Sequence, residues 1–261
     1  MSDSIWQSIR EETEIDVRNE PILASFLHAT ILKHDSLEAA LSYHLANKLG
    51  CHETPAILIR EVIVEALQDD LCIVQSVRAD IQAVYERDSA CHRFSSPFLY
   101  FKGFLALQAY RIAHWLWEKN RTSLAFYFQH SISMSFGVDI HPAAKLGCGI
   151  MIDHATGLVI GETSVVGNNV SIMQSVTLGG TGKEDGDRHP KVADGVLISA
   201  GAKILGNIHI GEGAKIGAGS VVLQDVPKHT TAAGVPAKII GKPQSDQPAL
   251  EMNHQINCDL C

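Results

Sequence analysis

Apolar residues recur with a period of six along the second half of the chain. From position 140 onward an aliphatic residue opens each of eleven hexads, glycine often follows it, and the fifth position is usually small or aliphatic. Hexads of this kind are typical of a parallel β-helix, in which each one forms a short strand and a turn. The opening residues then point inward and stack from coil to coil. They stand at positions 140, 146, 152, 160, 166, 172, 198, 204, 210, 216 and 222.

The first half of the chain has a helical pattern instead. The leucines of residues 34–50 share one helical face, with Asp35 as the predicted N-cap and Gly50 as the predicted C-cap. Residues 53–70 and 95–120 predict two further helices, each of which starts with a hydroxyl residue followed by proline. The aromatic residues of the last segment predict a packed helical core rather than a ligand site.

The two halves also differ in their residue types. All 16 aromatic residues lie at or before Phe136, and 19 of the 21 glycines lie at or after Gly137. We therefore predict an α+β fold class with three parts. These are an all-α N-terminal domain (1–137), a parallel β-helix (138–242) and a flexible, polar C-terminal tail (243–261).

Two breaks interrupt the six-residue period. Two extra residues enter between Ile152 and Ile160, and a longer loop is predicted over residues 179–197. Insertions into a solenoid map to loops on one face, which is often the binding face. The longer loop carries a basic and titratable cluster that equally fits a solvated surface. That cluster consists of Lys183, Arg188, His189 and Lys191.

Composition narrows the class of protein. Hydrophobic residues make up 46% of the chain, and a net charge of −8 argues against a nucleic-acid or anionic-membrane surface. We expect no signal peptide, and residues 98–117 carry too many polar groups for a membrane span. The six scattered cysteines indicate reduced thiols in the cytoplasm, and the pair Cys258 and Cys261 is only a weak zinc signal.

Residues 139–157 place Asp139, His141, Asp153 and His154 in an aliphatic, glycine-rich run. A charged Asp–His pair costs free energy to bury unless it is partnered. From the residues alone, this run fits a catalytic base, a metal site or a solvated turn.

Several segments together resemble bacterial serine acetyltransferases, within the superfamily of hexapeptide-repeat acyltransferases. The resemblance covers about residues 20–243 and is most specific in the helical half, in "HPAAKLGCGIMIDHATG" and in "GGTGK" followed by "DRHPK". More widely shared segments are "GAGSVVL" and "AGVPAK".

The resemblance implies a left-handed β-helix and transfer of the acetyl group of acetyl-CoA to the hydroxyl of L-serine. The products would be O-acetyl-L-serine and CoA, at the start of cysteine biosynthesis, with L-cysteine as a competing inhibitor. It also implies a trimer formed through the β-helices and doubled to a hexamer through the helical domains. Acetyl-CoA would be a co-substrate, and we expect no permanently bound cofactor or metal.

His154 and Asp139 match the catalytic pair of the family. A neutral imidazole can take the proton of a serine hydroxyl near neutral pH, and a carboxylate can orient the imidazole. The two residues are 15 positions apart, close to the roughly 18 residues of one three-hexad coil.

The family also implies serine-binding roles for Asp88, Asp153, Arg188 and His189. Arg188 suits the α-carboxylate of serine, and the two aspartates suit its ammonium. Asp88 ends a predicted helix, so the helical domain would help to build the site.

Acetyl-CoA is expected in a groove between subunits. Small residues would let its pantetheine arm approach the backbone, and two lysines could meet its phosphates. The expected contacts are Gly180, Thr181, Ala200, Lys215 and Lys238.

Three alternatives stay open. One is an acetyltransferase for another small alcohol, such as homoserine. A second is a zinc enzyme like the γ-class carbonic anhydrases, with His141, His154 and His209 as ligands, although about three ligands must converge. A third is a regulatory scaffold without activity.

The tail departs from the family pattern. In many relatives a terminal isoleucine enters the active site of O-acetylserine sulfhydrylase, the next enzyme. This chain ends in Cys261, so we predict weak or absent docking to a sulfhydrylase.

Overall fold

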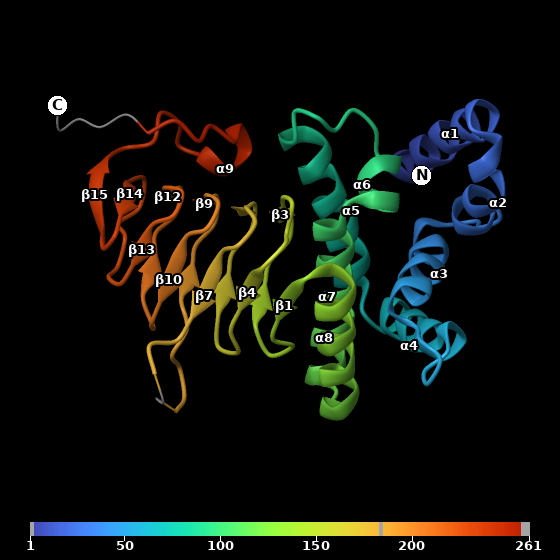
Figure 1. Ribbon diagram of the computed structural model, residues 1–261, viewed down its shortest axis with the longest axis horizontal. Coiled ribbons are helices and arrows are strands. Elements are labelled where there is room, and N and C mark those ends of the chain that lie inside the picture. The colour runs from blue at the N-terminus through green and yellow to red at the C-terminus, as the bar shows by residue number, and fades with distance from the viewer. Residues whose placement is uncertain (1–2, 183–184, 257–261) are drawn as a thin grey trace.

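A bundle of helices and a β-helix lie side by side in the computed structural model, which describes residues 3–182 and 185–256 (Figure 1). The helical part ends at Phe136, and the left-handed backbone of Gly137 (φ +65°) caps it before the first strand. Its elements are α1 (Ser4–Asn19), η1 (Pro21–Leu23), α2 (Ala24–Leu27), η2 (His28–Leu32), α3 (Leu37–Leu49), α4 (Ala56–Asp69), α5 (Leu71–Arg87), α6 (Ser95–Tyr100), α7 (Lys102–Glu118) and α8 (Thr122–Phe136).

The predicted helix starts are wrong by one or two residues. Ser36 rather than Asp35 caps α3, because its side chain accepts a hydrogen bond from the Ala39 amide. Helix α4 begins after Pro55 without a side-chain cap, so Thr54 does not serve as one. Gly50 is the C-cap of α3 as predicted, but with extended backbone (φ −70°) rather than left-handed backbone.

The helix predicted over residues 95–120 is broken into two. Phe101 has extended backbone (φ −85°, ψ 106°) and separates α6 from α7. The break turns the chain where α7 comes closest to the β-helix. A Cβ on Gly103 would lie 2.0 Å from the carbonyl oxygen of Ile152, so only glycine allows this approach.

Short strands, all parallel except β15, stack into three sheets, which are the faces of the β-helix. The first sheet contains β1 (Val138–Ile140), β4 (Leu158–Ile160), β7 (Thr177–Gly179), β10 (Lys203–Leu205) and β13 (Val221–Val222). The second contains β2 (Lys145–Leu146), β5 (Val165–Val166), β8 (Lys191–Val192) and β11 (His209–Ile210). The third contains β3 (Met151–Ile152), β6 (Ser171–Ile172), β9 (Leu197–Ile198), β12 (Lys215–Ile216), β14 (Thr231–Gly234) and β15 (Ala237–Gly241).

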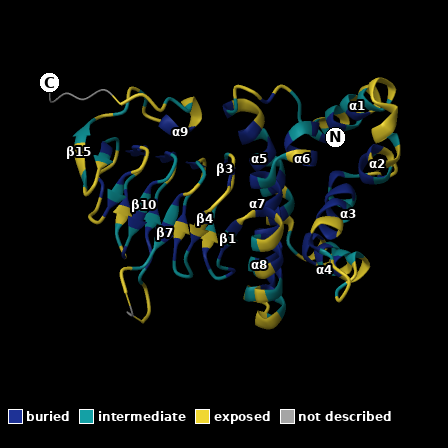
Figure 2. Cartoon of the chain, viewed as in Figure 1, coloured by how far each residue is buried: buried dark blue, intermediate teal, exposed yellow. Residues whose placement is uncertain are grey.

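The register confirms the predicted stacking of hexads. Ile140 pairs with Ile160, and Ile152 pairs with Ile172 in the third sheet. The stacked aliphatic residues are buried, and Figure 2 shows buried positions recurring from coil to coil.

The long loop predicted over residues 179–197 is too long, because one hexad lies inside it. Strand β8 pairs with β5 and β11, and Val192 is buried between Val166 and Ile210. The excursion from the coils is therefore confined to residues 180–190. Of its charged cluster, Lys183 lies outside the described residues.

The helical part is bonded to the first coil through a buried ion pair. Arg111 on α7 donates to the carboxylate of Asp80 on α5 (2.7 Å) and to the carbonyl oxygen of Gly147 (2.8 Å). Asp80 in turn accepts from the amide of Ile150 (3.0 Å). Pairing and hydrogen bonding of both charges offset the cost of burying them.

The described part of the tail packs against the β-helix, and its flexibility stays a prediction. Helix α9 (Pro248–Glu251) buries Ala249, whose carbonyl oxygen accepts from the Ser171 hydroxyl (2.8 Å). Met252 packs near Met151, and Lys215 donates to the carbonyl oxygen of Gln255 (2.5 Å). Cys258 and Cys261 lie outside the described residues.

In the described ranges, 3–182 and 185–256, none of the helices combines the length and the apolar character needed to cross a bilayer.

Candidate active site

A cleft of about 680 Å³ lies where the end of α5, the turn between α6 and α7, and the end of β3 meet. Asp88 enters it from the helical part, and Asp153 and His154 enter it from the β-helix. Three residues predicted for the site from distant parts of the sequence therefore line one cleft.

The two extra residues in the six-residue period are what bring His154 into the cleft. His154 and Ala155 both have left-handed backbone, with φ of 54° and 62°. This conformation is uncommon for residues other than glycine and is often found at functional sites. The turn leaves the His154 side chain 69% exposed, while the coil continues at Leu158.

Asp153 is the carboxylate within ion-pair range of the imidazole. Its Oδ2 atom lies 3.6 Å from Nε2 of His154, which is beyond a good hydrogen bond. Burial raises the pKa of Asp153, the nearby His154 acts in the opposite direction, and Asp88 raises the pKa further.

Asp139 has a different partner. Its Oδ1 atom accepts a hydrogen bond of 2.7 Å from the side-chain amide of Gln129 on α8. Within the described parts of the chain, no hydrogen bond or ion pair joins Asp139 to His154. The orienting role of Asp139 therefore stays a prediction.

Arg188 and His189 do not line the cleft of the same chain. Arg188 donates to the carboxylate of Glu162 (2.6 Å), and this ion pair lowers the pKa of Glu162. His189 is 7% exposed and lies with Nδ1 2.9 Å from the Thr163 hydroxyl. Burial and the neighbouring Arg188 lower the pKa of His189, which favours the neutral imidazole.

One chain thus carries two separate groups of predicted site residues. The cleft group is Asp88, Asp153 and His154, and the corner group is Arg188 and His189.

Two residues that support the corner group were missed in the sequence. Glu162 pairs with Arg188, and the Thr163 hydroxyl accepts from the amides of both Arg188 (3.0 Å) and His189 (3.1 Å). The available signal was the polar pair directly after Gly161, at a corner of the hexad pattern. A Cβ on Gly161 would lie 2.1 Å from the His189 ring.

The cleft also contains residues that the sequence did not single out. Tyr100 and Phe101 line it, as does Lys102, which donates to the Thr156 hydroxyl. The local signal was Gly103 within the aromatic stretch, which was interpreted as helix core.

The expected acetyl-CoA contacts are only partly accessible. Gly180 and Thr181 lie at the start of the excursion, and Ala200 lies in the turn after β9. Lys238 is exposed on β15. Lys215 is only 4% exposed beneath the tail, and burial lowers its pKa, so its role at a phosphate stays a prediction that requires the tail to move.

The three histidines considered as zinc ligands lie on different parts of the β-helix. His141 follows β1, His154 follows β3, and His209 is on β11. No group of three or more potential ligands is gathered within residues 3–182 and 185–256.

Two family models match the chain. The first, described as serine acetyltransferase, N-terminal, matches residues 5–109. The second, described as bacterial transferase hexapeptide (six repeats), matches residues 189–224. The curated serine acetyltransferase of Salmonella typhimurium is 62% identical over 253 residues, which are 97% of this chain and 93% of that protein.

Solved structures agree with these matches. The serine acetyltransferase of Vibrio cholerae has a TM-score of 0.97 at 60% identity, covering 98% of this chain and 100% of that one. A serine acetyltransferase in complex with cysteine has a TM-score of 0.96 at 59% identity, covering 98% and 100%. A serine acetyltransferase from Brucella abortus in complex with coenzyme A has a TM-score of 0.91 at 54% identity, covering 92% and 96%. The predicted fold, an all-α N-terminal region and a left-handed parallel β-helix, is confirmed.

Proposed function

Because this chain belongs to the serine acetyltransferase family, we propose that it uses His154 as the general base of that reaction. The enzyme transfers the acetyl group of acetyl-CoA to the hydroxyl of L-serine, giving O-acetyl-L-serine and CoA in the synthesis of cysteine. The observation that carries the assignment of the base is the meeting of His154 with two carboxylates in one cleft.

The proton transfers follow from the chemistry of the imidazole. His154 takes the hydroxyl proton while the serine oxygen attacks the thioester carbonyl carbon. The tetrahedral intermediate then collapses, the carbon–sulfur bond breaks, and the imidazolium returns the proton to the departing CoA thiolate. The exposed imidazole can exchange its proton with solvent and with substrate.

The ammonium group of serine would lie between Asp88 and Asp153, which line the same cleft. A cation between them favours the ionised form of Asp153, whose pKa burial raises. L-cysteine has the same ammonium and carboxylate, so it would compete at this position, as the cysteine complex of a relative supports.

The carboxylate of serine would be bound by Arg188 and His189 from a neighbouring subunit. The two residues lie outside the cleft of their own chain, so a second copy must supply them if they contact the same substrate. A trimer with cyclic symmetry completes three such sites at once. Doubling through the helical domains gives a hexamer of about 170 kDa from a chain of 28.3 kDa.

Acetyl-CoA would run along the groove beside this interface, where Gly180, Thr181 and Ala200 allow close approach to the backbone. Lys238 is the accessible cation for a phosphate. The coenzyme A complex of a relative supports this class of ligand. We place the reaction in the cytoplasm, because the four cysteines within the described residues are free thiols.

Release of the free CoA thiol tests the function directly. Full-length enzyme is supplied with acetyl-CoA and either L-serine or a panel of small alcohols that includes homoserine, with and without a zinc chelator. We expect turnover with L-serine, and far slower turnover with homoserine. Faster turnover of homoserine would reassign the substrate, loss on chelation would favour the zinc enzyme, and no turnover would favour the scaffold.

A further inference from the structure

The wall of the cleft that carries Asp88 is a connecting segment rather than a helix. Residues 88–94, here called the Asp88 wall, join α5 to α6, and Asp88, Ser89 and Ala90 line the cleft. The Ala90 amide donates to the Asp88 carboxylate (2.8 Å), and the Cys91 amide donates to the backbone carbonyl oxygen of Asp88 (2.9 Å). The position of this carboxylate therefore depends on how the wall is held at its two ends.

One end is bonded to the β-helix. Arg87, the last residue of α5, is 7% exposed and donates to the Ser171 hydroxyl (3.2 Å) and to the side-chain oxygen of Asn169 (3.2 Å). The end next to Asp88 is thus fixed to the same coil stack that carries His154.

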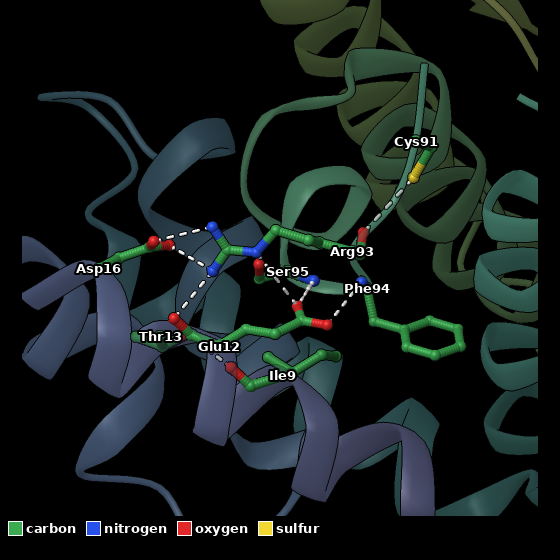
Figure 3. Close-up of polar contacts among 8 residues, drawn as sticks. All are labelled: Ile9, Glu12, Thr13, Asp16, Cys91, Arg93, Phe94 and Ser95. Carbon is green, nitrogen blue, oxygen red and sulfur yellow. Dashed lines mark hydrogen bonds and ion pairs between the residues drawn. The ribbon is translucent and has the colours of Figure 1, made fainter. Parts of the chain in front are cut away.

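The other end is bonded to α1, as Figure 3 shows. Arg93 forms a two-point ion pair with Asp16, in which each terminal nitrogen lies 2.8 Å from a carboxylate oxygen. It also donates to the carbonyl oxygen of Glu12 (2.8 Å). Paired planar groups of this kind fix orientation as well as distance.

The side chain of Glu12 completes the attachment. Its two carboxylate oxygens accept from the amides of Phe94 (3.2 Å) and Ser95 (2.7 Å), where α6 begins. Helix α6 leads to Tyr100 and Phe101, which also line the cleft. Glu12 and Asp16 of α1 therefore hold residues 93–95, which lie in the chain between the cleft residues 88–90 and the cleft residues 100–102.

We infer that Arg93, together with Glu12 and Asp16 of α1, positions the Asp88 wall for the ammonium group of the substrate. The inference rests on the proposed role of Asp88. Neither Arg93 nor Glu12 lines the cleft within the described residues, so they act through Asp88 and are positioning residues.

The expected effect is on serine binding more than on stability. Arg93 is 38% exposed, and ion pairs at partly exposed sites contribute little to the free energy of unfolding. A displacement of about 1 Å at a substrate-binding group can cost up to 10²-fold in rate. We expect Arg93→Ala to raise the KM for L-serine about tenfold and to leave the KM for acetyl-CoA unchanged.

The matched control is Arg78→Ala. Arg78 on α5 also pairs with two carboxylates, Asp3 and Glu38, and is 28% exposed, but it does not line or adjoin the cleft. The Arg78→Ala substitution should leave the KM for L-serine unchanged. If Arg78→Ala raises the KM for L-serine as much as Arg93→Ala does, both effects reflect general destabilisation, and the inference is overturned.

The decisive readout is a double-mutant cycle in the full-length enzyme with L-serine. If Arg93 acts only through Asp88, Arg93→Ala should add almost nothing to the KM of Asp88→Asn, and Arg93→Lys should restore part of the loss. Turnover of 3-hydroxypropionate, which keeps the carboxylate and hydroxyl but lacks the ammonium, should respond to neither substitution.

The outcomes separate this inference from the proposed function. An unchanged KM in Asp88→Asn would remove the ammonium site and the inference together. A raised KM in Asp88→Asn with full additivity in the double variant would overturn only the role of Arg93. If Arg93→Ala does not fold, Glu12→Gln takes its place in the same cycle, because it removes the charge and leaves one acceptor oxygen for the two amides of Phe94 and Ser95.

Discussion

His154 and Asp153 are adjacent in the chain, and their side chains meet in the cleft with Nε2 3.6 Å from Oδ2. The carboxylate expected to orient the imidazole, Asp139, is bonded to Gln129 instead. In this arrangement the imidazole lies within ion-pair range of Asp153, while Asp139 is held by the helical part.

The first prediction concerns the base. His154→Ala should lower kcat by about 10²–10⁴, the usual contribution of a positioned general base. The KM for acetyl-CoA should change little, because the imidazole takes a proton and does not bind the coenzyme. Steady-state assays of CoA thiol release measure both constants. Near-full turnover in this variant would refute the mechanism.

The second prediction concerns pH and the inhibitor. Burial raises the pKa of Asp153, so this carboxyl takes up a proton at a higher pH than an ordinary aspartate. As the pH falls, it loses its attraction for the ammonium of L-cysteine, and affinity should fall. Calorimetric titration of L-cysteine at successively lower pH should show this loss in the wild type at a higher pH than an ordinary aspartate would give, and Asp153→Asn should flatten it. Asp225→Asn, at an exposed carboxylate, serves as the control.

The third prediction concerns the shared site. Arg188→Ala should weaken L-serine and L-cysteine together and spare acetyl-CoA, because both amino acids present the same carboxylate. Separately inactive His154→Ala and Arg188→Ala chains, unfolded and reassembled as a mixture, should recover activity. Random assembly pairs an intact base with an intact arginine at about a quarter of the sites. No recovery in verified mixed oligomers would place all these residues within one chain.

The fourth prediction concerns stability. Burial lowers the pKa of His44 to about 4, against 6.5 in the unfolded chain. Between these values the unfolded state binds more protons, so the free energy of unfolding decreases as the pH falls from 6.5 to 4, by roughly 3 kcal/mol. Urea unfolding at pH 7 and pH 5 should show a smaller difference in His44→Gln than in the wild type. His52→Gln, at an exposed histidine, should keep the full difference.

The fifth prediction concerns the tail. A peptide of residues 252–261 should bind the cognate sulfhydrylase weakly, and Cys261→Ile should improve its affinity about 5- to 150-fold through added apolar burial. Titration of both peptides into that enzyme measures the ratio. Tight binding by the native peptide, with no gain from isoleucine, would contradict the docking rule.

The sequence predicted the parts of the fold that repeat. Hexads stack because each buried aliphatic residue meets an equivalent one in the next coil, so the stacking of Ile140 on Ile160 was predicted from their period. Val192 was missed because polar loop residues surround its hexad. The break at Phe101 was missed because its cause, the contact of α7 with the β-helix, involves distant residues.

The sequence predicted which residues belong to the candidate site better than it predicted which of them lie together. Asp88, Asp153 and His154 do line one cleft. The pairing of Arg188 with Glu162 and the covering of Lys215 by the tail depend on contacts between segments. The tail has few apolar residues and no period, so nothing local indicated that Ala249 would be buried.

The stack of parallel strands has two ends, and each is covered by an element outside the hexad pattern. Helices α7 and α8 lie over the first coil, and the antiparallel pair of β14 and β15 closes the last one (Figure 1). Exposed strand edges are templates for pairing with another chain. Deleting residues 1–136 should therefore do more than remove Asp88: it would uncover backbone and apolar surface on the first coil, and the truncated chains should pair through these uncovered coils, while β14 and β15 still close the other end.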